Sequence, residues 1–246
     1  MLLLKEKPNI QHTSIDEEQS SKFGKPVGEY ITIFCDKSDD DEQITQDLAQ
    51  IINEMLSNLL CDVQEPKFLV AGLGNSNITA DSLGVRVAEK VLATAHFAAL
   101  PEFDELGLNQ VNIFMPRVMA QTGFESADQI KFITAGMKPD CLIVVDSLSC
   151  SSMERLVKTI QITDTGLLPG SGVGNNRREI SQETLGFPVI AIGVPTVVFL
   201  PHECEEPLVP RDIDIMVNRF SKVISNAINN ALNPSLSCEE VQVLVM

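Results

Sequence analysis

The chain has 246 residues, a formal net charge of −16 and a sequence pI near 4.5. An acidic chain without a Lys/Arg-rich run argues against a nucleic-acid partner, because nothing in it would neutralise phosphates. No apolar stretch approaches the roughly 20 residues that cross a bilayer, and the opening apolar run is too short for a signal peptide. We therefore expect a soluble, cytoplasmic protein with no membrane partner.

Apolar runs and amphipathic stretches alternate along the chain. Runs rich in branched and apolar residues predict strands over Tyr30–Phe34, Phe68–Gly72, Val111–Met115, Cys141–Val145, Thr159–Thr163 and Val189–Val194. Helical spacing of apolar residues predicts helices between Ile44 and Leu59, between Leu83 and Ala95, around Ile130 and Ile133, and between Ile213 and Ala231. This order predicts an α/β fold with a mostly parallel sheet and helices on both faces.

The domain organisation is simple. Residues 1–28 are polar and turn-rich, which predicts a loosely held N-terminal arm. Residues 29–246 are long enough to bury a full core as a single α/β domain, because sheets covered by helices on both faces often reach this size.

Two aspartates follow buried strands. Asp146 comes directly after Cys141–Val145, and Asp81 follows the glycine- and asparagine-rich turn after Phe68–Gly72. In open α/β sheets, ligands bind in the crevice beyond the carboxyl ends of the strands, so one site is expected. Two carboxylates held close cannot both ionise cheaply, and one keeps its proton while the other is charged. The charged carboxylate can then deprotonate water while the protonated one polarises an amide carbonyl, which is hydrolysis without a covalent intermediate.

A structural interpretation of the same residues stays open. An aspartate near a helix start is most often an N-cap, which would suit Asp81. Asp146 precedes Ser-Leu-Ser and could equally cap a following helix.

Other kinds of site have weaker patterns. Gly72 and Gly74 open a dinucleotide fingerprint, but Asn77 stands in place of its third glycine, and the glycine loop 170–174 lacks the lysine of a P-loop. The three histidines have no nucleophile motif around them, and the six cysteines form no metal-binding pattern and are expected to be reduced thiols. A metal held by Asp81, Asp146 and a histidine would be an alternative, but these residues do not have the sequence spacing that is typical of metal ligands. We expect no metal and no cofactor.

Several long segments resemble the germination protease (spore protease) family of spore-forming bacteria. In chain order they are GLGNSNITADSLG, PRVMAQTGFES, CLIVVDSLSCSSMERLVKTIQITDTGLLPGSGVGN, ETLGFPVIAIGVPTVV and the closing DIDIMVNRFSKVISNAINNALNP. The resemblance begins near Ile15 and covers nearly all of the chain. It implies a phosphorylase/hydrolase-like fold related to hydrogenase-maturation proteases. It also implies an atypical aspartic-type endopeptidase that degrades small acid-soluble spore proteins in the spore core at germination, made as a zymogen and assembled as a homotetramer.

The resemblance also assigns site residues. The family's two catalytic aspartates fall by motif on Asp81 and Asp146, the pair already reached from the strand ends. Further positions match residues near the family's cleft and would shape the substrate site: Asn75, Asn77, Asp164, Gly170, Ser171, Gly172 and Gly174.

Two departures from the family pattern concern regulation and assembly. Family members usually continue after Pro195–Val198 through an Asp-containing stretch and a longer helical insertion, whereas here Phe199 follows. The arm over residues 1–28 is also short, so only a short pro-segment is expected there. These departures keep open an alternative function, that of a sporulation-associated relative that binds protein or a metal without cleaving.

Overall fold

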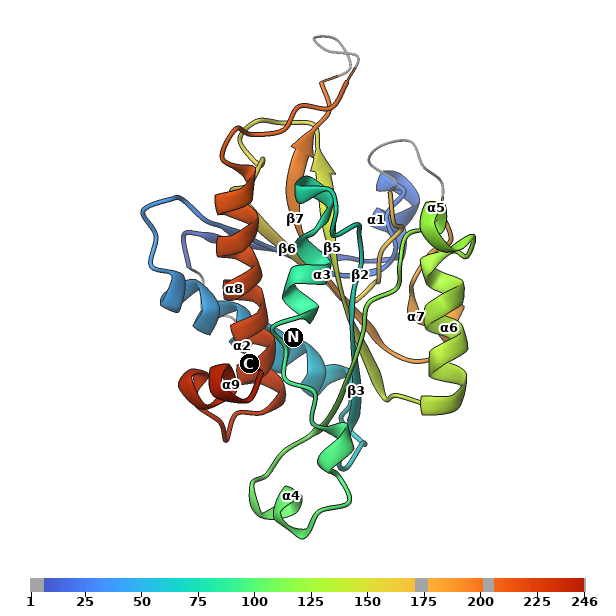
Figure 1. The fold of residues 1–246 in the computed structure, drawn as a ribbon. Coiled ribbons are helices and arrows are strands. Elements are labelled where there is room, and N and C mark those ends of the chain that lie inside the picture. Colours follow the sequence, from blue (N-terminus) through green and yellow to red (C-terminus); the bar gives the residue numbers. More distant parts are fainter. Residues whose placement is uncertain (1–6, 171–176, 201–205, 246) are drawn as a thin grey trace.

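The computed structural model describes residues 7–170, 177–200 and 206–245, and Figure 1 shows how their elements are arranged. The strands are β1 (Ile10–Ile15), β2 (Gly28–Phe34), β3 (Lys67–Gly72), β4 (Gln110–Phe114), β5 (Cys141–Cys150), β6 (Thr159–Thr163) and β7 (Val189–Val198). The helices are α1 (Glu17–Phe23), α2 (Asp41–Leu59), α3 (Leu83–Ala88), α4 (Pro101–Glu105), α5 (Met119–Thr122), α6 (Ser126–Met137), α7 (Gln182–Leu185), α8 (Ile213–Leu232) and α9 (Cys238–Val245). Two short 3-10 helices are η1 (Thr79–Asp81) and η2 (Ala95–Phe97).

The strands form one sheet in the order β1-β2-β6-β7-β5-β3-β4. Strands β7, β5, β3 and β4 pair in parallel. Strands β6, β2 and β1 extend the sheet from β7 in antiparallel pairs. The predicted α/β class is confirmed, and the sheet is a parallel half joined to an antiparallel half.

Helices cover both faces of the central strands. Side chains of successive strand residues point to opposite faces, so Ile143 of β5 packs with α2, α3 and α8 while Val144 packs with Ile130 of α6. Figure 1 shows α8 and α3 on one side of the sheet and α6 on the other. In the described ranges, no helix has the length and apolarity to cross a membrane.

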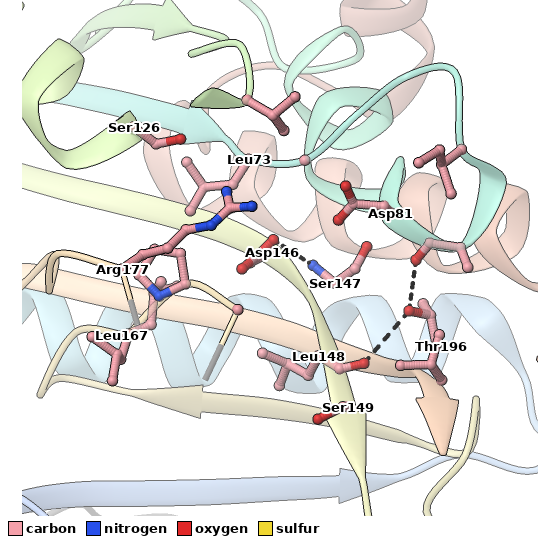
Figure 2. Close-up of a pocket in the computed structure, with 18 of the residues that line it drawn as sticks. Leu73, Asp81, Ser126, Asp146, Ser147, Leu148, Ser149, Leu167, Arg177 and Thr196 are labelled. Carbon is pink, nitrogen blue, oxygen red and sulfur yellow. Dashed lines mark hydrogen bonds between the residues drawn. The ribbon is translucent and has the colours of Figure 1, made fainter. Parts of the chain in front are cut away.

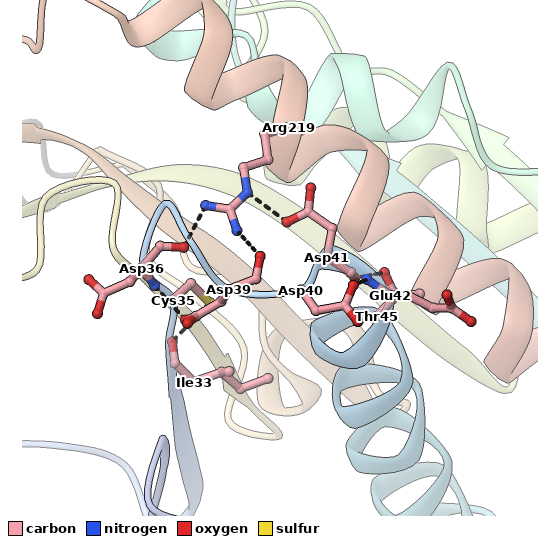
Figure 3. A network of polar contacts seen from close by, with 9 residues as sticks. All are labelled: Ile33, Cys35, Asp36, Asp39, Asp40, Asp41, Glu42, Thr45 and Arg219. Carbon is pink, nitrogen blue, oxygen red and sulfur yellow. Dashed lines mark hydrogen bonds and ion pairs between the residues drawn. The ribbon is translucent and has the colours of Figure 1, made fainter.

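A polar network fixes the start of α2. Asp40 is its N-cap and accepts a hydrogen bond from the Glu42 N–H at 3.0 Å. Arg219 of α8 donates from Nε to Asp41 Oδ1 at 2.6 Å, and its other nitrogens donate to backbone carbonyls of the preceding loop (Figure 3). The acidic segment is therefore placed at a helix N-terminus, where its charge is favourable, and is bound to the neighbouring helix α8.

Two segments differ from the expectation drawn from the sequence. Within the N-terminal arm, β1 pairs with β2 along its length and α1 follows with a capping box at Asp16. The helix expected between Leu83 and Ala95 ends at Ala88, because backbone groups beyond it form hydrogen bonds with a side chain of α8 instead of with the helix. Asn229 of α8 accepts a hydrogen bond from the Leu92 N–H at 2.9 Å and donates one to the Lys90 carbonyl at 3.0 Å.

Strands β5 and β7 run further than their apolar runs indicated. β5 continues past Asp146 to Cys150, paired with β7 throughout, and β7 continues past Pro195. The register shifts there, between Leu148 and Ser149, and an irregularity of this kind tolerates a proline without an N–H. Asp146 therefore lies inside a strand, and the interpretation of Asp146 as the cap of a following helix is wrong.

Candidate active site

A pocket of about 520 Å³ lies beyond the carboxyl end of β3. The turn after β3, the C-terminal part of β5 and the segment that follows β6 all contribute to its walls. Figure 2 shows Asp81 and Asp146 facing this space from neighbouring elements, with Arg177 beside Asp146. The structure thus brings the two predicted aspartates to one site.

Asp146 is the more buried of the pair. It is 6% exposed, and burial raises the pKa of its carboxyl group to about 7, with the nearby charge of Asp81 as the second cause. The Ser147 N–H donates to Asp146 Oδ1 at 2.9 Å, and this bond and the charge of Arg177 oppose the rise. Desolvation outweighs both, so this carboxyl group can hold a proton near neutral pH.

Asp81 is positioned by a tight turn. The Asn75 N–H donates to Asp81 Oδ2 at 3.0 Å and to the Asp81 carbonyl at 2.9 Å. Gly74, with φ of 110°, is required there because a Cβ would lie 1.9 Å from the Asp81 carbonyl oxygen. Burial raises the pKa of the Asp81 carboxyl group, against the opposing effects of the Asn75 hydrogen bond and Arg177. Its side chain makes no capping bond to α3, which begins after Ser82.

Hydrogen bonds also fasten this turn to the long strands. The Thr196 hydroxyl of β7 donates to the Ala80 carbonyl at 2.6 Å (Figure 2). The Leu83 N–H donates to the Ser147 hydroxyl at 3.4 Å. Asp81 is therefore held relative to Asp146 by contacts from both β5 and β7.

This arrangement suits a shared proton. Both carboxyl groups have raised pKa values, and each faces the same solvent-accessible pocket. At a pH where one is ionised, the charge of that one favours the protonated form of the other. The pair can supply a general base and a general acid at the same time.

The other predicted site residues occupy different places. Asn75 holds Asp81 through its backbone, and Asn77 is exposed and donates from its N–H to Asn75 Oδ1 at 3.1 Å. Asp164 accepts a hydrogen bond from the Glu29 N–H at 2.8 Å and so joins β6 to β2. Gly170 lines the pocket. The remaining predicted residues, Ser171, Gly172 and Gly174, lie outside the described residues.

Arg177 is the site residue that the sequence did not reveal. It follows the glycine-rich loop at a distance of some thirty residues from Asp146, and no motif singles it out. Its guanidinium lies in the pocket and lowers the pKa of both aspartates, although burial has the larger effect. A cation beside the pair can stabilise negative charge that develops there.

The described histidines stand apart from the pair. His12 contacts Glu29 between β1 and β2, and His96 lies in η2 against Phe97. Within the described ranges, no group of three or more His, Cys, Asp or Glu side chains is arranged to hold a metal ion. His202 lies outside those ranges.

Comparison with known proteins identifies the class. The family model for germination protease matches residues 4–206, so the chain belongs to the germination protease family. A germination protease from Geobacillus sp. (strain WCH70) is 46% identical over 196 residues, which is 77% of this chain and 52% of that protein. One from Caldanaerobacter subterraneus subsp. tengcongensis is 35% identical over 94% of this chain and 86% of that protein.

The matches differ in how much of each relative they cover. The chain spans about half the length of the Geobacillus protein and of one from Bacillus cereus (strain AH187), which is 46% identical. Among solved structures, a NiFe hydrogenase maturation protease from Thermococcus kodakarensis is 18% identical and covers 72% of this chain and 99% of its own, with a TM-score of 0.37. That score is too low to support any inference about this chain.

Proposed function

We propose that this chain is an atypical aspartic-type endopeptidase that initiates the degradation of small acid-soluble spore proteins during spore germination. Membership of the germination protease family supports the activity and its biological setting. The single observation that carries the mechanism is the convergence of Asp81 and Asp146 on one pocket, both with raised pKa values.

In this mechanism the two aspartates have different roles. Asp146 is the more buried and keeps its proton near neutral pH, whereas Asp81 is ionised. Asp81 removes a proton from water, and the water oxygen attacks the scissile carbonyl carbon. Asp146 donates a hydrogen bond to the carbonyl oxygen as it becomes negative, and Arg177 adds positive charge nearby. Collapse of the tetrahedral intermediate breaks the C–N bond, and the leaving nitrogen takes up a proton from Asp81.

The setting forms part of the proposal. The enzyme would act in the spore core on unfolded spore proteins, be made as a zymogen and assemble as a homotetramer. Sedimentation of the purified protein tests the tetramer, and mass analysis of protein from germinating spores tests removal of a short N-terminal segment.

A cleavage assay tests the central activity. Purified protein is incubated with a small acid-soluble spore protein, and products are identified by mass. Asp81→Asn and Asp146→Asn are each expected to lower the rate by at least about a hundredfold, because each removes one partner of the acid and base pair. Circular dichroism checks that both variants fold.

A matched control comes from the opposite end of β5. Asp140 accepts a hydrogen bond there from the Lys67 N–H at 2.8 Å, and an asparagine oxygen can still accept it. Asp140→Asn should therefore cleave at the wild-type rate. Wild-type-like turnover in both active-site variants would contradict the mechanism, and a chelator should leave the rate unchanged. No cleavage by the wild-type protein would favour the relative that binds without cleaving.

A further inference from the structure

The C-terminal part of β5 has a neighbouring strand on one side only. β3 pairs with β5 as far as Gly72 opposite Val145, and then the chain turns away. β7 accompanies β5 on its other side as far as Cys150 opposite Val198. Among the described strands, none lies beside residues 147–150 on the β3 side.

Two backbone hydrogen bonds show which residues face this open side. The Val145 carbonyl accepts from the Leu73 N–H at 2.8 Å, on the β3 side. The Cys150 carbonyl accepts from the Phe199 N–H at 2.8 Å, on the β7 side. Because backbone polar groups of successive strand residues point to alternate sides, Ser147 and Ser149 face the β3 side, as Val145 does.

The polar groups on this edge are only partly used. The Ser147 N–H donates to Asp146 Oδ1. In the part of the chain that the structure describes, neither the Ser147 carbonyl nor the backbone N–H and carbonyl of Ser149 has a hydrogen-bond partner on this side. Both residues are half-buried and line the pocket that holds Asp81 and Asp146. Unpaired backbone groups in such a place are satisfied when another chain adds to the strand.

We propose that the polypeptide substrate binds as an added strand along Ser147–Ser149, in the line that β3 would follow if it continued. This inference rests on the proposed function and specifies what the site recognises. One substrate residue would donate its N–H to the Ser147 carbonyl and accept from the Ser149 N–H, which is the pair of bonds made by one residue of a neighbouring parallel strand.

This mode of binding explains how the site meets its substrate. The added strand runs directly beside Asp146, so its backbone carbonyls pass the carboxylate pair. Main-chain hydrogen bonds supply affinity for any extended chain, and side-chain pockets add selectivity. The substrate class is therefore an extended, unfolded polypeptide segment, and a segment locked in a folded domain is excluded.

A backbone-methylation scan tests the proposal with the wild-type protein. Mass analysis first locates the cleavage site in a small acid-soluble spore protein, and a short synthetic peptide spanning that site becomes the parent. Each residue of the peptide is then N-methylated in turn, and each peptide is measured as an inhibitor of cleavage of the parent. N-methylation of the peptide residue that pairs with β5 removes one ladder hydrogen bond and should weaken inhibition about tenfold. N-methylation of the residue immediately before or after it should leave inhibition unchanged.

A variant of the protein provides the complementary test. Ser149→Pro removes the N–H that faces the open edge without removing a bond of the ladder with β7, and it should raise KM about tenfold or more. Asp140→Asn, at the opposite end of β5, leaves this edge unchanged and is the control, expected to keep the wild-type KM. Equal effects of the two substitutions in folded protein would contradict the proposal.

The outcomes separate this proposal from the function on which it rests. If the parent peptide is cleaved but N-methylation weakens inhibition equally at adjacent positions, or at no position, strand addition is overturned. The proposed protease function then still stands. A parent peptide that is neither cleaved nor bound overturns both.

Discussion

The two halves of the sheet differ in how completely their strands are paired. In the antiparallel half, β2 is paired along most of its length by β1 on one side and β6 on the other. In the parallel half, β3 has 6 residues while β5 and β7 have 10 each, so β5 outruns its neighbour. The unequal lengths leave the space in which Asp81 and Asp146 meet. The pocket therefore exists because one central strand, β3, stops before its neighbour β5.

The two halves also treat a buried aspartate differently. Asp47 of α2 is 4% exposed and is paired with Lys7, from the chain before β1, and with Gln43 at 2.7 Å. Asp146 is 6% exposed, and among the described residues it forms no ion pair. A buried carboxylate held in an ion pair supports the fold, whereas one that forms no ion pair is poised to exchange a proton.

The largest expected effect comes from filling the turn that shapes the pocket. Gly74→Ala would place a Cβ against the Asp81 carbonyl at a positive φ, so the turn must shift. We expect the free energy of unfolding to fall by roughly 4 kcal/mol or more and cleavage to be lost. In Gly136→Ala, within α6, the new Cβ meets nothing within 4 Å, and a gain of about 0.5–1 kcal/mol is expected. Urea unfolding compares the two, and an intact, active Gly74→Ala protein would contradict this account of the turn.

A second experiment tests how burial without an ion pair makes the contribution of Asp146 to stability depend on pH. Because its folded pKa is raised to about 7, from about 4 in the unfolded chain, the native state binds more protons between these values. Its contribution to stability is therefore full below pH 4 and is lost as pH rises through 7. Asp146→Asn cannot ionise and should lose less stability than the wild type between pH 4 and pH 7, by up to about 1.4 kcal/mol for each pH unit in that window.

Urea unfolding at several pH values measures this difference. Asp140→Asn, at the other end of β5, should follow the wild-type pH dependence. Parallel curves for the wild type and Asp146→Asn would contradict the raised pKa.

The ion pair in the other half should give a smaller effect and leave chemistry alone. Lys7→Met leaves Asp47 buried without its cation, and we expect a loss of about 1–3 kcal/mol in the free energy of unfolding. Lys37→Met is the control, because Lys37 and its partner Asp212 have exposed side chains, and a change within about 0.5 kcal/mol is expected. Cleavage by folded Lys7→Met protein should match the wild type. A loss of activity without a loss of stability would mean that the two halves are coupled.

Much of the parallel half follows from its amino-acid sequence. Apolar runs located β3 and β5, and the aspartates after them indicated one site at the carboxyl edge of the sheet. The full length of β5 could not be predicted from the sequence, because the residues after Asp146 are polar and resemble the start of a helix capped by Asp146. Pairing with β7 decides that conformation, and a partner strand is not visible in local sequence.

The antiparallel edge and Arg177 were harder to predict for different reasons. β1 is an edge strand with only Ile15 buried, so it lacks the apolar alternation that marks a half-buried strand. Arg177 lines the pocket, but it belongs to none of the motifs by which the two aspartates were found. A single arginine outside any motif offers no residue spacing from which a role could be predicted.

Carboxyl-detected NMR titration can show in the free protein, without substrate, whether Asp81 and Asp146 share a proton. Asp146 is expected to titrate near pH 7 in the wild-type protein. In Asp81→Asn, removal of the neighbouring charge should lower that pKa, while burial keeps it above the ordinary value near 4. An Asp146 carboxyl group that titrates near pH 4 in the folded wild-type protein, and does not respond to Asp81→Asn, would contradict a proton-sharing pair.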